Sequence, residues 1–185
     1  DGQVLGGVYV YSYGAGQVDL DFGEIVSTSG AEGLYVYTGS TVTELDIDVT
    51  GITSAGTGIG ATTYNNGATN ITATGSIIAG ANGVFVENNG TGRTNVQTGA
   101  VQSGDDYTAI DVMNADNVGD DATRDLTILS TGILDGGVHG IRAVQQGSGD
   151  LNITTDAKVS NRIVGIGLGA VDGETQYFNA SIKAT

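Results

Sequence analysis

Aromatic residues recur at alternate positions near the N-terminus, and they are the residues of this sequence best suited to contact a ligand. The residues concerned are Tyr9, Tyr11, Tyr13, Tyr35 and Tyr37, with Phe85 in the same register beyond Gly60. Alternate residues of a strand point to the same face of a sheet, so we predict one outward aromatic patch. A flat, partly apolar patch suits sugar rings or another protein. Cross-strand stacking that only stabilises the sheet, or packing beneath another part of a longer chain, stays open as an alternative role.

Carboxylates gather in one irregular stretch, residues 105–121, where they could ligate a calcium ion. The candidate ligands are Asp105, Asp106, Asp116, Asp120 and Asp121. Hard oxygen ligands suit Ca²⁺, but the spacing matches neither an EF-hand loop nor the Gly-Gly-x-Gly-x-Asp tandem of calcium-binding solenoids. We therefore favour a solvated acidic loop over a specific metal site, and we expect no cofactor.

Signals for catalysis are weak in this sequence. It contains no cysteine, no Gly-x-Ser-x-Gly nucleophile motif and no phosphate-binding glycine loop. The only histidine, His139, falls where other repeats carry turn residues, so we predict a turn residue and no zinc site. Cleavage of acidic polysaccharides by a lyase or a glycoside hydrolase is the enzymatic alternative, because a basic residue or paired carboxylates can supply acid and base. Its candidate bases are Arg93, Arg124, Arg142, Lys158, Arg162 and Lys183.

The charge balance excludes two classes of partner. The chain of 185 residues carries 21 acidic and 6 basic side chains, which gives a formal net charge of -15. This charge repels the phosphates of nucleic acids and the surface of anionic membranes. No apolar run approaches the roughly 18 residues of a membrane-spanning helix. We therefore expect no nucleic-acid partner and no direct insertion into a membrane.

A four-residue marker recurs along the chain and must position these side chains. It consists of a glycine, a hydrophobic residue, a variable residue and a second hydrophobic residue. Its first hydrophobic residues are Val8, Leu34, Ile59, Val84, Ile110, Ile141 and Ile166, spaced by 25 or 26 residues except for one interval of 31. Glycine precedes the hydrophobic residue in every case but one, where Ala109 stands. A fixed period of this length predicts a solenoid, in which each repeat buries its apolar face against its neighbours.

Two further apolar positions recur within the repeat. One is an alternating run upstream of the marker, as at Leu45 and Ile47, and the other lies seven residues before the marker, as at Ile52 and Ile77. Three inward-facing points per repeat predict an all-β fold, a three-sided parallel β-helix of about seven coils. The 32 glycines suit the tight turns between such strands. Antiparallel hairpins are the alternative fold.

The register of the repeats makes two predictions about individual side chains. Arg142 falls directly over Asp111, so these two residues should form a surface ion pair. Residues four positions after each marker form a column of hydroxyls and amides, which can hydrogen-bond from coil to coil at one corner. This column consists of Ser12, Thr38, Thr63, Asn88, Asn114, Gln145 and Ala170.

We expect residues 1–185 to form a single β-solenoid segment of a longer stalk, in which the irregular repeat at 105–121 carries a polar insertion. Neither end of the sequence resembles a solenoid cap. An uncapped end exposes apolar core and unpaired strand edges, and such a surface favours association with another copy. End-to-end self-association is therefore expected.

Residues 75–86 (GSIIAGANGVFV) and residues 132–141 (GILDGGVHGI) illustrate the repeat: an apolar pair, a turn rich in glycine, asparagine or aspartate, and then the marker. These turns resemble the coils of bacterial autotransporter passenger domains of the pertactin-like class, and the likeness covers nearly the whole chain. The resemblance implies a right-handed parallel β-helix that a Gram-negative bacterium secretes or displays at its cell surface. It also implies a role in adhesion or virulence, with a host-cell surface protein or glycan as partner, and it transfers no active-site motif.

Overall fold

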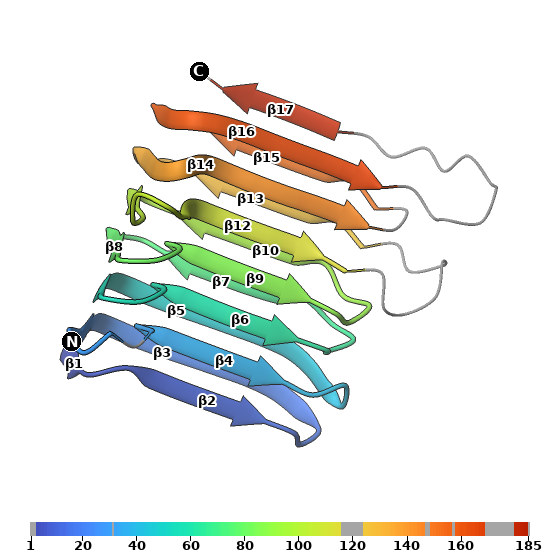
Figure 1. Ribbon diagram of the computed structural model, residues 1–185. Helices are drawn as coiled ribbons and strands as arrows, with labels where there is room; N and C mark the ends of the chain where they lie inside the picture. Colours follow the sequence, from blue (N-terminus) through green and yellow to red (C-terminus); the bar gives the residue numbers. More distant parts are fainter. Residues whose placement is uncertain are drawn as a thin grey trace.

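The computed structural model describes residues 3–30, 32–115, 124–146, 149–156, 158–168 and 180–184 of the chain. Within these ranges the chain forms seventeen β-strands, which pair in parallel, and no helix. The strands stack coil upon coil into a parallel β-solenoid (Figure 1). The all-β class and the parallel stacking predicted from the repeat are thus confirmed. The described residues include no helix long and apolar enough to cross a membrane.

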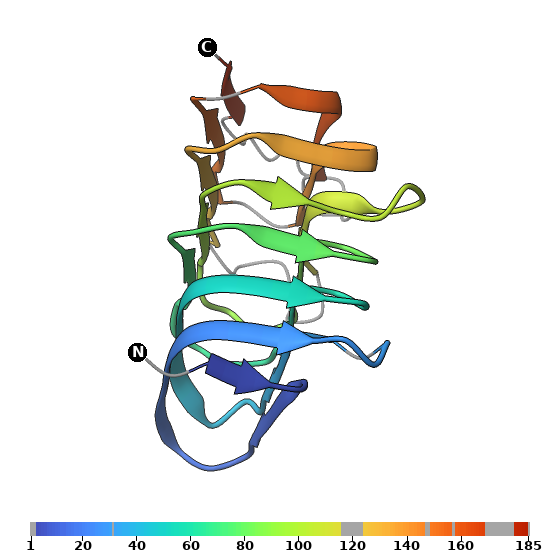
Figure 2. The ribbon, with the colours of Figure 1, turned by 90° about the vertical axis from the view of Figure 1, so that its left-hand side faces the viewer.

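The strands line up in three sheets along the sides of the coil, and Figure 2 shows the successive coils lying one above another. The first sheet carries the markers and consists of β2 (Val8–Ser12), β4 (Leu34–Thr38), β6 (Ile59–Thr63), β9 (Val84–Asn88), β12 (Thr108–Asn114) and most of β14 (Leu134–Gln146) and β16 (Val159–Leu168). The second sheet consists of β3 (Gly16–Ser27), β5 (Val42–Ser54), β7 (Thr69–Ala73), β10 (Thr94–Thr98), β13 (Leu126–Ser130), β15 (Leu151–Thr155) and β17 (Ala180–Ala184). The third, narrower sheet consists of β1 (Gln3–Leu5), β8 (Ile77–Ala79) and β11 (Val101–Gln102), with the ends of β3 and β5 and the starts of β14 and β16.

The solenoid makes about five turns, fewer than the seven coils predicted. A marker identifies a strand, whereas a turn is the circuit between two markers, so seven markers delimit only six circuits. Parts of the later circuits also lie outside the described residues. The count of coils is corrected accordingly, and the three-sided arrangement of strands is unaffected.

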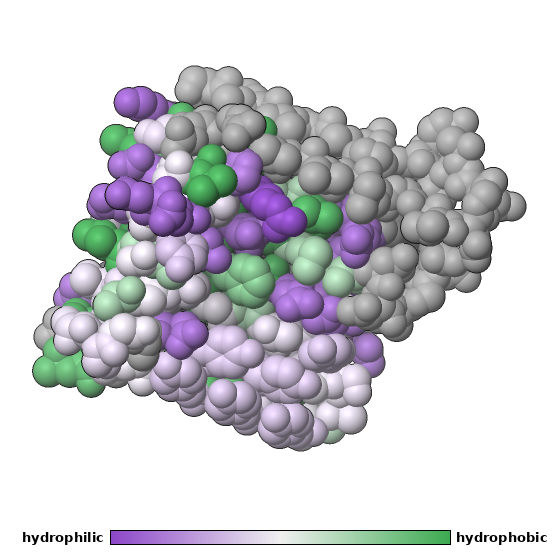
Figure 3. Space-filling view, viewed as in Figure 1, coloured by the Kyte–Doolittle hydropathy of each residue, from purple (hydrophilic) through white to green (hydrophobic). Residues whose placement is uncertain are grey.

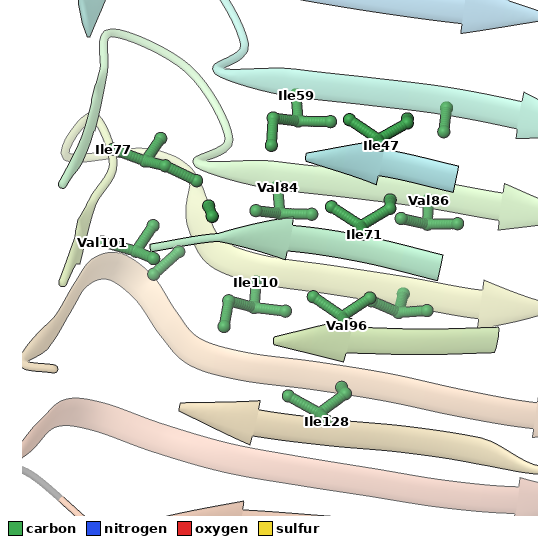
Figure 4. Close-up of a cluster of buried hydrophobic side chains, with 14 of the residues drawn as sticks. Ile47, Ile59, Ile71, Ile77, Val84, Val86, Val96, Val101, Ile110 and Ile128 are labelled. Carbon is green, nitrogen blue, oxygen red and sulfur yellow. The ribbon is translucent and has the colours of Figure 1, made fainter. Parts of the chain in front are cut away.

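Inward-facing side chains of the three sheets stack along the axis and fill the column. The stacks labelled in Figure 4 are Ile59, Val84 and Ile110 of the first sheet, Ile47, Ile71, Val96 and Ile128 of the second, and Ile77 and Val101 of the third. Each of these side chains is buried. Identical or similar β-branched side chains thus recur at the spacing of neighbouring strands, which builds a continuous core with little aromatic content.

The marker register is confirmed as far as Ile141, with each marker paired to the marker of the next coil. The pairing of the Ile141 strand with the strand of the following coil differs. The prediction that Ile166 stacks on Ile141 is wrong. Ile163 pairs with Ile141, whereas Ile166 pairs with Val144. The register shifts between Asp135 and Ile141, so this part of β14 uses more residues than the facing part of β16.

The predicted corner column of hydroxyls and amides is buried and hydrogen-bonded from Thr63 to Gln145. Thr63 donates to Asn88 over 3.1 Å, and Asn114 donates to Gln145 over 2.7 Å. Between these pairs, Thr94 of the second sheet accepts from Asn88 at 2.9 Å and donates to Asn114 at 2.6 Å. The ladder is therefore confirmed over these coils, and a residue outside the predicted column completes it.

Two arginines join neighbouring coils in different ways. The predicted ion pair is present, because Nη1 of Arg142 lies 2.8 Å from Oδ1 of Asp111 at the surface. Arg124, by contrast, is fully buried. Its Nη1 donates to the carbonyl oxygens of Gly90 and Ala115, at 2.7 and 2.5 Å. Arg124 thus joins the backbone after β9 to the backbone after β12.

Candidate functional site: a tyrosine ladder

Six tyrosines from three consecutive coils form a row of rings along the outside of the first sheet. We call this row the tyrosine ladder, and its members are Tyr9, Tyr11, Tyr13, Tyr35, Tyr37 and Tyr64. The pairing of β2 with β4 places Tyr9 beside Tyr35 and Tyr11 beside Tyr37. Strand alternation turns the intervening Val10 toward the core and leaves the tyrosines outside. In Figure 3 the surface over β2 and β4 is pale, which marks intermediate hydropathy.

Neighbouring rings of the ladder lie against one another at tilted angles. Their centroid distances run from 5.4 Å for Tyr13 and Tyr37 to 6.4 Å for Tyr11 and Tyr37, with interplanar angles from 31° to 55°. Aromatic pairs at such distances attract each other beyond simple burial. The rings of the first coil nonetheless stay open to solvent, since Tyr9, Tyr11 and Tyr13 are 48%, 58% and 68% exposed. The ladder is therefore ordered by its own contacts and still accessible.

Gly60 separates Phe85 from the ladder. A Cβ atom at Gly60 would lie 3.1 Å from Cδ2 of Tyr35, so the tyrosine ring covers the space that a larger residue would occupy. Phe85 pairs with Gly60 from the far side. Among the described ring pairs, none joins Phe85 to a tyrosine. The structure thus brings the five predicted tyrosines together and leaves Phe85 apart from them.

Hydrogen bonding and neighbouring rings favour the protonated form of two phenols of the ladder, Tyr9 and Tyr37. Tyr9 donates to Glu32 over 2.8 Å, and Tyr35 donates to Thr62 over 3.5 Å. The hydrogen bond to Glu32 raises the pKa of Tyr9, because an ionised phenol would lose this bond and face a second negative charge. Partial desolvation among the neighbouring tyrosines raises the pKa of Tyr37. Both phenols are therefore hydrogen-bond donors at neutral pH.

A groove of about 330 Å³ opens at the turn that ends the ladder. Its lining comes from three coils and consists of Tyr13, Tyr37, Gly39, Ser40, Thr41 and Tyr64. The turn is held on both sides: Thr41 donates to the carbonyl oxygen of Tyr13 over 3.0 Å, and Asn66 donates to that of Ser40 over 3.2 Å. The groove is therefore a fixed feature with an uncharged lining.

Tyr64 is the member of the ladder that sequence reasoning missed. Its ring centroid lies 5.7 Å from that of Tyr37, and its side chain is 37% exposed. A signal was present, because Tyr64 stands five residues after its marker, as does Tyr13. Both residues follow the last strand position, where alternation no longer predicts which way a side chain points. The turn geometry was needed to bring Tyr64 into the row.

The acidic stretch gives no assembled metal site in the described part of the chain. Asp105 and Asp106 are exposed in the turn between β11 and β12. Within the described ranges, no three histidine, cysteine or carboxylate side chains are grouped so as to hold a metal ion. His139 lies in register with Thr108, as predicted, but the prediction of a turn residue is wrong, because His139 stands within strand β14. The remaining candidates lie outside the described residues: Asp116, Asp120 and Asp121.

A second hollow, of about 420 Å³, contains residue types that polysaccharide cleavage would require. Its lining includes Arg93, Glu44 and Asp125. Both carboxylates accept hydrogen bonds within the fold, Glu44 from Asn70 over 3.2 Å and Asp125 from the backbone nitrogen of Asp150 over 2.9 Å. These contacts favour a structural role for the two carboxylates over a role as acid and base.

The chain matches no family model, and no curated protein or solved structure is significantly similar to it. A function for this chain is therefore inferred from the geometry of the solenoid and of its tyrosine ladder.

Proposed function

We propose that this chain is a binding segment of a bacterial surface or secreted protein of the autotransporter passenger kind, and that it acts in adhesion to a host-cell surface protein or glycan. The tyrosine ladder is the proposed contact surface. The observation that carries the proposal is that six contacting tyrosines lie on one outer face while the outer rings stay largely exposed.

Tyrosine is well suited to such a role. Its ring contributes a large apolar area with few rotatable bonds, and its hydroxyl supplies a hydrogen-bond donor at the rim. Tyrosine is also over-represented among the residues that dominate binding energy. The side chains of Tyr11 and Tyr13 are 58% and 68% exposed. If the ladder served only to stabilise the sheet, such exposed rings would not be required.

The assignment to a surface-exposed bacterial protein rests on two features. The coils resemble those of autotransporter passengers, and the solenoid fold presents a long, regular side to a partner. The strong negative charge keeps such a segment soluble and disfavours acidic partners. Binding without catalysis is favoured, because the candidate carboxylates near Arg93 are engaged within the fold.

Loss of attachment on truncating the ladder tests the proposal. The double variant Tyr35→Ala with Tyr37→Ala should weaken attachment to host cells by about 1–3 kcal/mol, as expected for central aromatic contacts. Two controls change the chain elsewhere: Thr72→Ala with Gln97→Ala on the outside of the second sheet, and deletion of residues 117–121. Thermal unfolding should show all three variants folded. A larger loss on deleting 117–121 than on changing the tyrosines would move the binding site to the acidic insertion.

Polysaccharide cleavage is the alternative activity, and it can be tested separately. Incubation of the purified chain with pectin, alginate and hyaluronan should give no new reducing ends and no unsaturated products. Reproducible turnover that disappears in Arg93→Ala would replace the binding proposal with an enzymatic one.

A further inference from the structure

We infer that the tyrosine ladder is a site of oxidative cross-linking, at which a one-electron oxidant joins Tyr13 to Tyr37 through a carbon–carbon bond. The oxidant is of the haem peroxidase class and acts with hydrogen peroxide. This modification goes beyond the proposed function and does not depend on adhesion.

Tyrosine is the main oxidisable residue of this chain. The sequence contains no cysteine, no tryptophan and a single methionine, the half-buried Met113. Cysteine and methionine are common targets of oxidants in other proteins. Six of the eight tyrosines lie in the ladder. An oxidant at the surface of this protein therefore meets most of its oxidisable side chains in one place.

The ladder combines an accessible ring with a ring that has several partners. Tyr13 is 68% exposed, and its ring centroid lies 5.4 Å from that of Tyr37, the shortest separation among the described ring pairs. Tyr37 also lies 6.4 Å from Tyr11 and 5.7 Å from Tyr64. A ring that has lost an electron can regain one from a ring in contact, so oxidation at either end of the row reaches Tyr37.

The backbone keeps Tyr13 beside Tyr37 while the outer ring can turn. Tyr11 pairs with Tyr37 across β2 and β4, and Tyr13 follows two residues later. Thr41 donates to the carbonyl oxygen of Tyr13 over 3.0 Å, which ties the end of the first coil to the turn after β4. Exposed side chains change rotamer within picoseconds to nanoseconds. The edge of the Tyr13 ring can thus meet the edge of the Tyr37 ring without a change in the backbone.

The reaction balances with one molecule of hydrogen peroxide. Each phenol loses one electron to the peroxidase and one proton to water, which leaves two neutral phenoxyl radicals. The radicals join through ring carbons ortho to their oxygens, and the two ortho hydrogens then move to the oxygens. In all, two tyrosines give up two electrons and two protons, and hydrogen peroxide takes up both and becomes two molecules of water.

The new bond would fasten the first coil to the second. Among the described residues, β2 pairs only with β4, so this edge of the solenoid has a partner on one side alone. A covalent cross-link restricts the unfolded chain, as a disulfide does. We therefore expect amide hydrogen exchange in β2 to slow after oxidation.

The test treats the dilute full chain with a haem peroxidase and hydrogen peroxide. Dityrosine fluorescence should appear, and the intact monomer should lose the mass of two hydrogen atoms. A protease that cuts after glutamate separates Tyr13 from Tyr37 in the untreated chain, because Glu24 and Glu32 lie between them. After oxidation the two peptides should remain joined, and fragmentation should place the bond at Tyr13 and Tyr37.

Phenylalanine variants keep the rings but cannot form the bond. Tyr37→Phe should lower the dityrosine yield of the monomer by more than half, since three of the five ring pairs include Tyr37. Tyr13→Phe should remove the joined peptides. Tyr107→Phe is the matched control, because Tyr107 is 44% exposed and belongs to none of the described ring pairs. It should leave the yield unchanged.

Three results would overturn the cross-link. Dityrosine confined to species larger than the monomer would mean that the rings couple only between chains. Equal yields from Tyr37→Phe and Tyr107→Phe would mean that exposure alone, and not ring contact, selects the tyrosines. Unchanged hydrogen exchange in β2 after oxidation would contradict a bond between the first two coils.

Discussion

Gly58 lies so close beneath Ile77 that a Cβ atom at position 58 would be 2.5 Å from Cγ2 of the isoleucine. It would also overlap the carbonyl oxygen of Gly83 in the next coil. The same relationship joins Gly33 to Ile52, at 2.5 Å. Packing thus requires glycine at positions 33 and 58, because the first and third sheets meet there without room for a side chain, whereas one other coil holds Ala109 at the corresponding position.

The change Gly58→Ala should destabilise the solenoid by about 1–3 kcal/mol, the usual cost of forcing an extra carbon into a packed interior. Gly14→Ala is the matched control, since a Cβ atom there would meet nothing within 4 Å. Its effect should stay within about 0.5 kcal/mol. Urea unfolding followed by circular dichroism measures both variants. Equal stability of the two would mean that the coils relax to accept the methyl group.

Asn114→Ala should remove the centre of the buried ladder. Thr94 would lose its acceptor and Gln145 its donor, at 2.6 and 2.7 Å in the intact protein. Leaving buried polar groups unpaired costs about 1–3 kcal/mol each, so we expect a loss of at least about 2 kcal/mol. Gln97→Ala removes an exposed amide and should be nearly neutral. A small effect of Asn114→Ala would show that water replaces the amide.

Arg124→Met keeps most of the side-chain volume but removes the donors to Gly90 and Ala115. We expect a loss of about 2 kcal/mol or more, because two buried carbonyl oxygens become unpaired. Hydrogen exchange should rise first at the ends of β12 and β13, which Arg124 fastens. Arg93→Met, at an exposed arginine, is the control. Unchanged exchange in Arg124→Met would contradict the role assigned to the buried guanidinium.

Tyrosine ionisation should weaken the ladder only at high pH. The folded-state pKa values of Tyr9 and Tyr37 are raised, so the neutral phenols contribute stability that is fully present below the unfolded pKa of about 10. That contribution is lost as the pH rises through the folded pKa. Ultraviolet titration should show tyrosinate forming at higher pH in the native chain than in urea. Tyr37→Phe should shrink this difference, and coincident titration curves would contradict the raised values.

The first coil should favour end-to-end association. Among the described residues, β2 pairs only with β4, and the inward-facing Val10 and Leu20 are only partly buried. Sedimentation should show larger species as salt rises, because screening shortens the range of charge repulsion from about 10 Å at 0.1 M to about 3 Å at 1 M. Val10→Lys should suppress association, whereas Gln97→Lys, with the same change in charge, should not. A monomer at every salt concentration would rule out this surface.

The repeat in the sequence suffices to predict the parallel solenoid, its inward stacks and the pair Arg142–Asp111. In a solenoid the spatial neighbour of a residue lies one repeat away along the chain, so sequence spacing maps directly onto contacts. The same mapping places Tyr9 beside Tyr35 and Tyr11 beside Tyr37. It fails at Ile166, because the irregular register of β14 changes the number of residues in the circuit.

Only the tertiary structure decided the contacts that join different sides of a coil. Thr94 enters the ladder from the second sheet, Arg124 turns into the interior, and Tyr64 bends toward Tyr37 to complete the groove. The periodicity of the sequence predicts which residues stack along the axis. It contains no information about contacts between different sides of a coil. The orientation of a side chain at a turn depends on local backbone geometry and on the facing sheet, and neither is encoded in the spacing of the repeat.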